Sequence, residues 1–552
     1  KSHVALVDID LHTFRGIARM VAVDLLGPQD VVQTVFGSVE EYVPPFQKKY
    51  FSADMMSRYE PLADAMTELE MSEGTPDEDA WQNLEKHWKS FVDFSWCSQW
   101  DGKKYDVVFY GMSGYSGYLI MQYLKRNVLA KDAKAMTFAF AGRTSSKVAE
   151  MRDREFKDTA WKDTPVLVAD FDDVVSIIDV VKSAHVIVNV AGPYMLTEGE
   201  VLIDACIWCK TDYVDISQEL PWSLRIKDLH KYAVDAGVKV VPSAGGSAYS
   251  DLGVGLLAKK LREDYGEPVR SAVCYCSGGG NPAGSSGGVL KTRSAMSNLS
   301  GETKRQMNDP FALGGFIPEI DRNGIKSVDI QQGTGYATVK VREEDKDSKI
   351  LEVTQDTKLG VWRAPHVNSF FDTRVVRRSN MLHADLGNQP YGTTFNFMEY
   401  ALLPKEQAEA AKAEAKEKGA MPYGQYGMPF DEEKNNVAQQ GKNFEEGEGP
   451  AAEDMAKSYT GFFLHAETES GNGLKCSFVG GDGYQETARM AVETAMTLRF
   501  DKDKLPYKGG VLTPSTACGG ALVDRLMKSG AKFKMGEWLE GSDLAPPSID
   551  VK

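Results

Sequence analysis

Three glycines at three-residue spacing, Gly111, Gly114 and Gly117, indicate a phosphate-binding turn. The apolar run Val107–Tyr110 precedes them, and a helical pattern that includes Leu119 follows. In such a strand–turn–helix unit the first glycine turns the chain, the second lets a pyrophosphate approach backbone N–H groups, and the third lets the helix pack on the strand. The helix N-terminus then attracts the phosphates. Because glycines also close ordinary strand–helix turns, the neighbouring sequence must decide between these interpretations.

Strand-like and helix-like patterns alternate between residues 105 and 243. Short apolar runs separated by amphipathic stretches, such as Val174–Val181 and Val201–Trp208, are typical of a parallel sheet covered on both faces. Ligands of such sheets bind outside the carboxyl ends of the strands. We therefore predict an α/β Rossmann domain, a doubly wound parallel sheet, with a dinucleotide site. The expected strands are Val107–Tyr110, Met136–Ala141, Pro165–Ala169, Val186–Val190, Tyr213–Ile216 and Val238–Val241.

The end of the second predicted strand bears on which dinucleotide binds. It carries Arg143 and neighbouring hydroxyls, with no acid at its tip. An acid there would bind the ribose 2′-hydroxyl of NAD, whereas arginine pairs bidentately with the 2′-phosphate of NADP. We expect NADP rather than NAD, with the alternative that Arg143 is a surface residue beginning the next helix. The expected cofactor-binding residues are Gly111, Ser113, Gly114, Tyr115, Ser116, Gly117, Arg143, Ser145, Asp170, Asn189, Ala191, Gly192, Pro193 and Tyr194.

Several segments together resemble the saccharopine dehydrogenase-like oxidoreductases. The resemblance implies a Rossmann domain, an α+β domain inserted after it, and a C-terminal segment that returns to the first domain. It does not imply that saccharopine is the substrate, because several members of the family are poorly defined in substrate. The segments that carry it are 111–117, 141–147, 188–194, 213–219, 509–515 and 522–526.

Three loops expected to face the nicotinamide depart from the family pattern. Gln218 stands where relatives have glycine, and Val289 stands where they have threonine. The loop Gly245–Gly253 is one residue shorter and lacks an acid and a proline. Since the phosphate-binding segments are unchanged, this combination fits either an altered substrate or a binding protein that has lost its chemistry.

Catalytic residues are only weakly indicated. Asp215, Ser217 and Glu219 alternate at period two, which places them on one face at the tip of the fifth strand. Asp215 and Glu219 would suit proton transfer or orientation of a substrate amine. The alternative is that Asp215 or Ser217 caps the helix beginning near Pro221. Tyr194 is the remaining candidate, as a proton donor beside the nicotinamide or as a wedge against the cofactor ring.

Length and composition limit the possible functions. A chain of 552 residues is expected to hold two or three domains. Its 42% hydrophobic and 26% charged residues are typical of globular proteins. A net charge of −16 argues against nucleic acid or an anionic membrane as a direct partner. No uncharged apolar run reaches about 18 residues, so no transmembrane segment is expected.

The cysteines and histidines favour structural roles. Seven cysteines are sparse for this length, which favours a reducing intracellular setting. Cys206 and Cys209 have redox spacing but fall in a predicted helix, so two buried thiols are the favoured interpretation. Cys274 and Cys276 alternate in a predicted strand without a nearby histidine. No metal is expected, because the eight histidines show no metal-ligand spacing, and His230 is expected to be structural.

The domain plan has three parts. Residues 1–104 are expected to form a helical N-terminal extension. Residues 105–250 form the Rossmann domain, to which 485–535 return, and 251–484 form a second α+β domain with a largely antiparallel sheet and a low-complexity insert at 401–457. The strands expected in the second domain are Ser271–Ser277, Tyr336–Arg342, Ile350–Thr354 and Gly461–Ala466, followed by a helix from Thr487 to Leu498.

Two of these regions are candidate surfaces for a protein partner. Residues 1–104 hold four of the nine tryptophans, which pack either on the Rossmann domain or on another protein. Residues 401–457 combine an Ala/Glu/Lys helix at 404–418 with a glycine-containing acidic stretch. Because the chain begins with Lys1, we expect either removal of a targeting peptide or an incomplete N-terminus. A removed targeting peptide favours a plastid or mitochondrial location, with a cytoplasmic location still open.

Two functions from different classes therefore remain. The first is an NADP-dependent oxidoreductase that transfers hydride to or from a small organic or lipid-like substrate. The second is a structural or regulatory subunit of a larger organellar assembly that keeps the nucleotide-binding fold. The intact glycine turn favours the first, and the altered loops and added segments favour the second.

Overall fold

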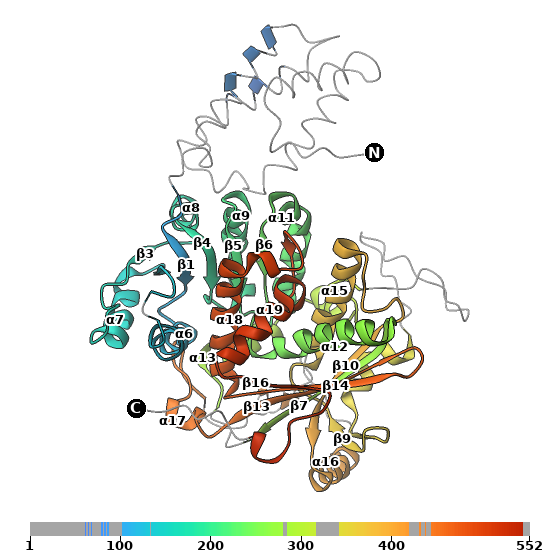
Figure 1. Ribbon diagram of the computed structural model, residues 1–552. Helices are drawn as coiled ribbons and strands as arrows, with labels where there is room; N and C mark the ends of the chain where they lie inside the picture. Colours follow the sequence, from blue (N-terminus) through green and yellow to red (C-terminus); the bar gives the residue numbers. More distant parts are fainter. Residues whose placement is uncertain are drawn as a thin grey trace.

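The computed structural model describes residues 102–544 except 133, 280–283, 316–341, 419–429, 432–435 and 438–442, and only isolated positions between 61 and 87 before them. Within this part of the chain, seven parallel strands form a sheet in the order β15-β6-β5-β4-β1-β2-β3 (Figure 1). The predicted Rossmann sheet is confirmed. Its strands are β1 (Tyr105–Tyr110), β2 (Phe138–Gly142), β3 (Val166–Val168), β4 (Ala184–Asn189), β5 (Asp212–Asp215), β6 (Lys239–Val241) and β15 (Gly510–Val511).

Both faces of this sheet are buried because helices cover each side. In β1, Val107 and Phe109 belong to one apolar cluster, while Val108 and Tyr110 belong to the other. This alternation follows from the two-residue period of a strand. The first face is covered by α6 (Tyr115–Tyr123), α7 (Ser145–Phe156), α18 (Gly483–Phe500) and α19 (Pro514–Lys528), and the second by α8 (Val174–Lys182), α9 (Glu200–Trp208), α10 (Leu220–Ile226) and α11 (His230–Ala236).

The C-terminal part of the chain returns to this sheet. β15 pairs in parallel with β6 at the sheet edge, and α18, which contains the predicted helix Thr487–Leu498, packs in the same core as β1 and β4. Residues 532–535 were expected in the returning segment. They form β16 (Lys532–Met535) instead, which pairs with β14 of the second sheet. The segment therefore ends by linking the two sheets.

The second sheet has the order β16-β14-β13-β7-β10-β9-β8. Its neighbouring pairs are antiparallel except for β7 and β10, so the prediction of a largely antiparallel sheet is confirmed. Helices α12 (Tyr249–Tyr265) and α15 (Ser369–Gly387) share the apolar core on one of its faces. Its remaining strands are β7 (Val269–Gly279), β8 (Thr354–Asp356), β9 (Val361–Ala364), β10 (Asn396–Leu403), β13 (Tyr459–Thr468) and β14 (Gly473–Gly480).

Of the strands predicted for the second domain, two are confirmed and one is wrong. Ser271–Ser277 and Gly461–Ala466 lie within β7 and β13. The strand predicted over Ile350–Thr354 is wrong, because residues 347–351 form a 3-10 turn and β8 begins only at Thr354. Ile350 is buried in a small aromatic cluster while Leu351 is 37% exposed, so one apolar anchor satisfies this run without strand pairing.

Other expectations concern segments of which little is described. The strand at Tyr336–Arg342 and nearly all of the extension 1–104 lie outside the described residues. In the insert at 401–457, the Ala/Glu/Lys helix is confirmed as α16 (Lys405–Lys418). A short helix, α17 (Ala452–Met455), lies near the C-terminal end of the insert. Two further helices, α13 (Gly287–Ser297) and α14 (Gly301–Met307), follow β7. Within the described chain, no helix is both long and apolar enough for a membrane span.

Asp204 of α9 should make stability depend on pH. It is 5% exposed, its Oδ1 contacts no donor among the described groups, and burial, with Glu200 adding to the effect, raises its pKa to about 7. Because the folded state favours the protonated acid, this stability is fully present below about pH 4 and is lost as pH rises to about 7. We expect Asp204→Asn to melt several degrees above the parent at pH 8 and to lose most of that advantage at pH 4.5.

Differential scanning calorimetry at the two pH values measures this difference. Asp179→Asn on neighbouring α8 is the matched control, since its carboxylate is 57% exposed. An advantage for Asp204→Asn of equal size at both pH values would contradict the titration of Asp204.

Candidate functional site

The glycine turn between β1 and α6 has two close backbone approaches, at Gly111 and Gly117, and an uncrowded position at Gly114. Gly111 has φ +90°, and a Cβ there would lie 2.6 Å from Ala191 N. A Cβ at Gly117 would lie 2.7 Å from Met112 Cα, so helix and turn touch backbone to backbone. Gly114 differs, because the nearest atom to its Cβ position is 3.7 Å away. The second glycine therefore leaves the room that a pyrophosphate requires.

The N-terminus of α6 is suited to binding an anion. Gly114 is its N-cap residue, and neither a capping side chain nor an acid occupies the first turn. Ser113 is exposed and Ser116 half-buried beside it. The Tyr115 side chain points elsewhere, since its hydroxyl donates to Pro450 O at 2.7 Å. Backbone N–H groups and the two serines, rather than the Tyr115 ring, are thus the groups suited to hold phosphates.

The tip of β2 presents hydroxyls and one cation. Arg143, Thr144 and Ser145 are exposed, and Thr144 precedes α7 without capping it through its side chain. Asp170 follows neighbouring β3. Burial raises the pKa of Tyr110, with Asp170 raising it further and Arg143 lowering it, so both charges lie near the Tyr110 hydroxyl. The arrangement suits a ribose phosphate placed between Arg143 and the start of α7.

The turn after β4 is held together by its own side chains. Asn189 Oδ1 accepts a hydrogen bond from Ala191 N at 3.0 Å, and its Nδ2 donates to the Tyr213 hydroxyl at 3.0 Å. The Tyr194 hydroxyl donates to Asn189 O at 2.8 Å, and burial raises the pKa of Tyr194 well above its usual value. In the free protein the Tyr194 hydroxyl is therefore engaged within the turn, and its role as a proton donor or as a wedge against the cofactor ring stays a prediction.

The predicted cofactor-binding residues gather at the carboxyl edge of the Rossmann sheet with different exposures. Those exposed or half-buried are Gly111, Ser113, Gly114, Ser116, Arg143, Ser145, Asp170, Ala191 and Gly192, and those buried are Tyr115, Gly117, Asn189, Pro193 and Tyr194.

Asp215 is a buried acceptor at the tip of β5. Its Oδ1 accepts from Ser217 N at 2.9 Å and Ser243 N at 3.0 Å. Its Oδ2 accepts from Trp222 Nε1 at 2.9 Å and the Tyr213 hydroxyl at 3.1 Å. Burial raises the pKa of Asp215 while these donors oppose the rise. Asp215 therefore ties β5, α10 and the turn after β6 together, and it does not cap α10, whose N-cap residue is Glu219.

Glu219 turns back toward the turn after β4. Its two carboxylate oxygens accept from Tyr194 N at 3.0 Å and Met195 N at 2.6 Å. Thr292 of α13 donates to it at 3.3 Å, and burial raises its pKa. Asp215 and Glu219 thus share a strand tip, as their spacing predicts, yet the described contacts make both of them structural.

Two of the three loops that depart from the family pattern meet directly, and the third packs against α18. Gln218 Nε2 donates to Ser247 Oγ at 2.6 Å, which joins the loop after β5 to that after β6. Ser286 begins the third loop, and its N–H donates to the Tyr484 hydroxyl at 2.8 Å. Val289, one turn into α13, donates its N–H to Ser286 Oγ. The sequence offered no signal for these contacts beyond the departures themselves.

The six cysteines that the structure describes are buried, and His230 is half-buried. Cys206 and Cys209 are buried in and just after α9, and His230 Nδ1 lies 3.2 Å from Val511 N. In β7, the sulfur atoms of Cys274 and Cys276 lie 3.9 Å apart. With a carboxylate oxygen of Glu399 they form a buried group whose potential ligand atoms all lie within 4.8 Å of one another. The expectation that the chain holds no metal stays a prediction.

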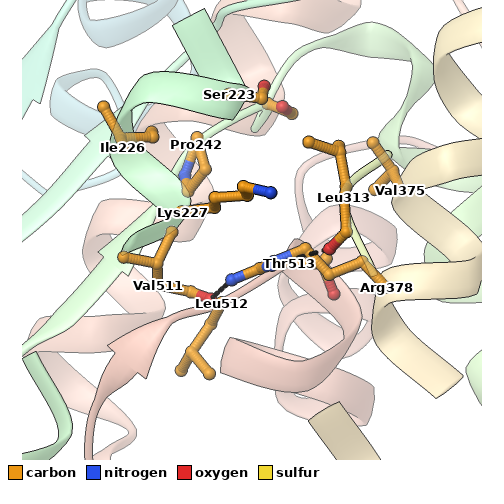
Figure 2. Close-up of a pocket in the computed structure, with 11 residues that line it drawn as sticks. Ser223, Ile226, Lys227, Pro242, Leu313, Val375, Arg378, Val511, Leu512 and Thr513 are labelled. Carbon is orange, nitrogen blue, oxygen red and sulfur yellow. Dashed lines mark hydrogen bonds between the residues drawn. The ribbon is translucent and has the colours of Figure 1, made fainter. Parts of the chain in front are cut away.

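A small pocket lies at the edge of the sheet formed by β6 and β15 (Figure 2). Its lining includes Lys227 and Arg378, and Arg378 donates to Leu313 O at 2.8 Å and Val511 O at 2.9 Å. Burial lowers the pKa of Arg378 to about 10. Because no residue of the glycine turn lines this pocket, it is separate from the dinucleotide site.

Known proteins are similar to this chain over most of its length. The trans-acting enoyl reductase of Mycobacterium ulcerans is 30% identical over 436 residues, which cover 78% of this chain and 97% of that protein. The protein of the same description from Mycobacterium leprae is 29% identical over 441 residues, with the same coverage. No protein-family model matches the chain.

The chain belongs to the trans-acting enoyl reductase family. The expected class, an oxidoreductase with a nucleotide-binding Rossmann domain, is thereby confirmed. Among solved structures, saccharopine dehydrogenase from Saccharomyces cerevisiae is 13% identical, with a TM-score of 0.38, and the alignment covers 79% of this chain and 100% of that chain. At that TM-score no residue role transfers. The choice of NADP, the organelle and a role as a complex subunit stay predictions.

Two glycines of the turn should respond differently to alanine. A methyl group at Gly114 would make only an ordinary van der Waals contact with Gly111 O in the free protein, whereas at Gly117 it would clash with the Met112 backbone. We expect Gly114→Ala to keep the melting temperature but to weaken dinucleotide binding about tenfold or more, or about 1.4 kcal/mol. Gly117→Ala should lower the melting temperature. Calorimetric titration with NADPH and thermal melting test both, and unchanged binding by a stable Gly114→Ala would place the pyrophosphate elsewhere.

Proposed function

We propose that this chain is an NADP-dependent enoyl reductase, which reduces a carbon–carbon double bond conjugated to a carbonyl group. The observation that carries the proposal is the uncrowded position of Gly114, where the nearest atom to a Cβ would be Gly111 O at 3.7 Å, at the uncapped N-terminus of α6. It occurs in a chain whose relatives over 78% of its length are enoyl reductases. A nicotinamide dinucleotide is the reductant that such a site accommodates.

The groups available at the site divide into two sets. Backbone N–H groups of α6, with Ser113 and Ser116, would hold the pyrophosphate. Arg143 would pair with the 2′-phosphate, because its planar fork matches two phosphate oxygens. A bound NADPH supplies the hydride. The substrate side is then formed by the loops that carry Gln218 and Ser247, which meet at the same edge of the sheet.

The relatives are described as acting in trans. We extend this to the present chain and propose that its enoyl substrate belongs to the product of a separate enzyme. Residues 1–104 and 401–457 stay the candidate surfaces for such a partner, and a plastid or mitochondrial location stays part of the proposal.

A non-catalytic subunit is the second candidate. The observation that favours it is that Tyr194, Asp215 and Glu219, the acids and hydroxyl predicted for chemistry, are all engaged in structural hydrogen bonds. Such a protein would bind the dinucleotide without turning over an enoyl substrate.

Arg143→Ala tests the cofactor preference. Arg143 is exposed at the tip of β2, so its removal should leave folding unchanged. We expect the variant to bind NADPH at least about tenfold more weakly, equivalent to about 1.4 kcal/mol, with little change for NADH. Lys157→Ala, an exposed cation at the opposite, C-terminal end of α7, is the matched control. An equal loss for both nucleotides would remove the argument for NADP.

Turnover separates the two candidate functions. The wild-type chain with NADPH and a trans-2-octenoyl N-acetylcysteamine thioester should oxidise the nucleotide and yield the saturated thioester, detected by mass spectrometry. Tight NADPH binding without saturation of this thioester or of acyl-carrier-bound enoyl chains would favour the non-catalytic subunit.

A further inference from the structure

Glu399 is a carboxyl group within the core-facing side of the second sheet. It lies in β10, is fully buried, and is two residues from Phe397 of the apolar core. Its Oε1 lies 2.9 Å from His366 Nδ1, and Ser369 donates to its backbone oxygen at 2.7 Å. An ionised carboxylate in such surroundings is strongly destabilising unless it is compensated. Glu399 therefore calls for a partner that shares its charge or its proton.

Asp372, in the first turn of α15, is that partner. Its Oδ1 accepts a hydrogen bond from Ser247 Oγ at 3.0 Å. Its Oδ2 and Glu399 Oε2 are both buried without a hydrogen-bond partner among the described groups, and the two carboxyl groups face each other closely enough to share a hydrogen bond once one of them is protonated. Burial raises the pKa of both acids, and Glu399 raises that of Asp372 further. Two carboxyl groups in contact cannot both ionise, so the pair retains one proton.

The other titratable groups facing this pair carry no compensating charge at neutral pH. Burial lowers the pKa of His366 to about 4. Burial also raises the pKa of Cys274 and of Cys276, the thiols that β7 directs toward Glu399. Ser250 of α12 adds a hydroxyl on the remaining side. Within the described chain, no lysine or arginine is among the groups that most affect the pKa of Asp372 or of Glu399.

The pair connects the candidate substrate edge to solvent. On one side, Asp372 accepts a hydrogen bond from the Ser247 hydroxyl, and Ser247 Oγ accepts one from the half-buried side chain of Gln218. Ser247 lies in the turn Gly246–Ala248 that follows β6, at the carboxyl edge of the Rossmann sheet. On the other side, the His366 side chain is 20% exposed. This series of hydrogen bonds thus crosses the junction between the two sheets, and its two acidic side chains lie in the interior.

We propose that Asp372 and Glu399 share the proton that completes the reduction, and that the Ser247 hydroxyl transfers it to the substrate. This inference rests on the proposed enoyl reductase function. Ser247 would be the catalytic residue, whereas Asp372, Glu399 and His366 act through it.

The proposed reduction adds a hydride to one carbon of the double bond and a proton to the other. Hydride delivered to the β-carbon moves the double-bond electron pair toward the α-carbon and the carbonyl, which leaves an enolate. For the transfer, the hydrogen bond that Ser247 donates to Asp372 reverses. Asp372 donates its proton to Ser247 Oγ while the Ser247 hydroxyl proton passes to the α-carbon, forming the new C–H bond. The carbonyl is restored, and His366 passes a proton from solvent to Glu399 in the same step, so the acid pair keeps one proton throughout.

The shared proton can be detected without substrate. Infrared spectra of the free protein at pH 7, recorded in an Asp204→Asn background because Asp204 is itself partly protonated there, should contain a protonated-carboxyl band that both Asp372→Asn and Glu399→Gln remove. Glu493→Gln, which changes a buried acid bonded to Tyr123 instead, should leave that band in place. Retention of the band in both pair variants would overturn the proposal. So would one divalent metal ion per purified chain bound through Cys274, Cys276 and Glu399, because Glu399 would then be ionised.

The transfer itself is tested by Ser247→Ala, which removes the relay and leaves the acid pair intact. We expect unchanged melting, a retained infrared band, an unchanged KM for NADPH, and kcat lowered on the order of a hundredfold, with a larger solvent deuterium isotope effect. Ser223→Ala is the control, since Ser223 is a buried serine outside this path. Normal kcat in a folded Ser247→Ala would overturn the proposal.

Failure of the two proposals can be told apart. A wild-type chain that saturates no enoyl thioester contradicts the enoyl reductase function, whatever the infrared spectra show. A wild-type chain that turns over, with Ser247→Ala and Asp372→Asn equally active and with unchanged pH profiles, supports the function and refutes the relay.

Discussion

The buried carboxylate of Asp215 is the constraint on which the edge of the Rossmann sheet depends. Four donors from β5, the loop after it, α10 and the turn after β6 satisfy it. Removing any one would leave a buried acceptor short of a partner, at a cost of about 1–3 kcal/mol. Tyr213, one of these donors, also accepts from Asn189, so the tips of β4, β5 and β6 are fixed relative to one another.

This rigid edge fixes the positions of the loops that carry Gln218 and Ser247, which are proposed to form the substrate side. The turn containing Ser243 leads directly into Gly246–Ala248, where Ser247 meets Gln218 and Asp372. Gly246 N donates to Thr487 Oγ1 at 3.1 Å, which holds the same turn against α18. The proton path therefore begins on a segment that is restrained from two sides. Positioning of this kind lets a hydroxyl act on a substrate without first becoming ordered.

The sequence predicted what depends on local pattern and missed what depends on distant contacts. Gly111, Gly114 and Gly117 have roles set by steric limits within one turn, so their spacing was informative. The alternation of Asp215 and Glu219 placed them at one strand tip, but which donors each accepts depends on Ser243 and on the turn after β4. Asp372 and Glu399 gave no signal, because an acid in a strand or in the first turn of a helix is ordinary until its burial is known.

The acid pair also bears on whether the chain has kept its chemistry. Replacing buried ionisable groups by well-packed apolar residues is often neutral or stabilising, so a purely structural subunit gains little from Glu399 in the middle of an apolar sheet face. Asp372 of this pair is hydrogen-bonded to Ser247, and Ser247 is hydrogen-bonded to Gln218. Both Ser247 and Gln218 lie in loops that depart from the saccharopine dehydrogenase-like pattern. An amide at position 218 supplies a donor that glycine lacks, and it donates to the hydroxyl that bonds the acid pair. Since this departure adds a link to a buried polar path, it favours an altered active site over a lost one.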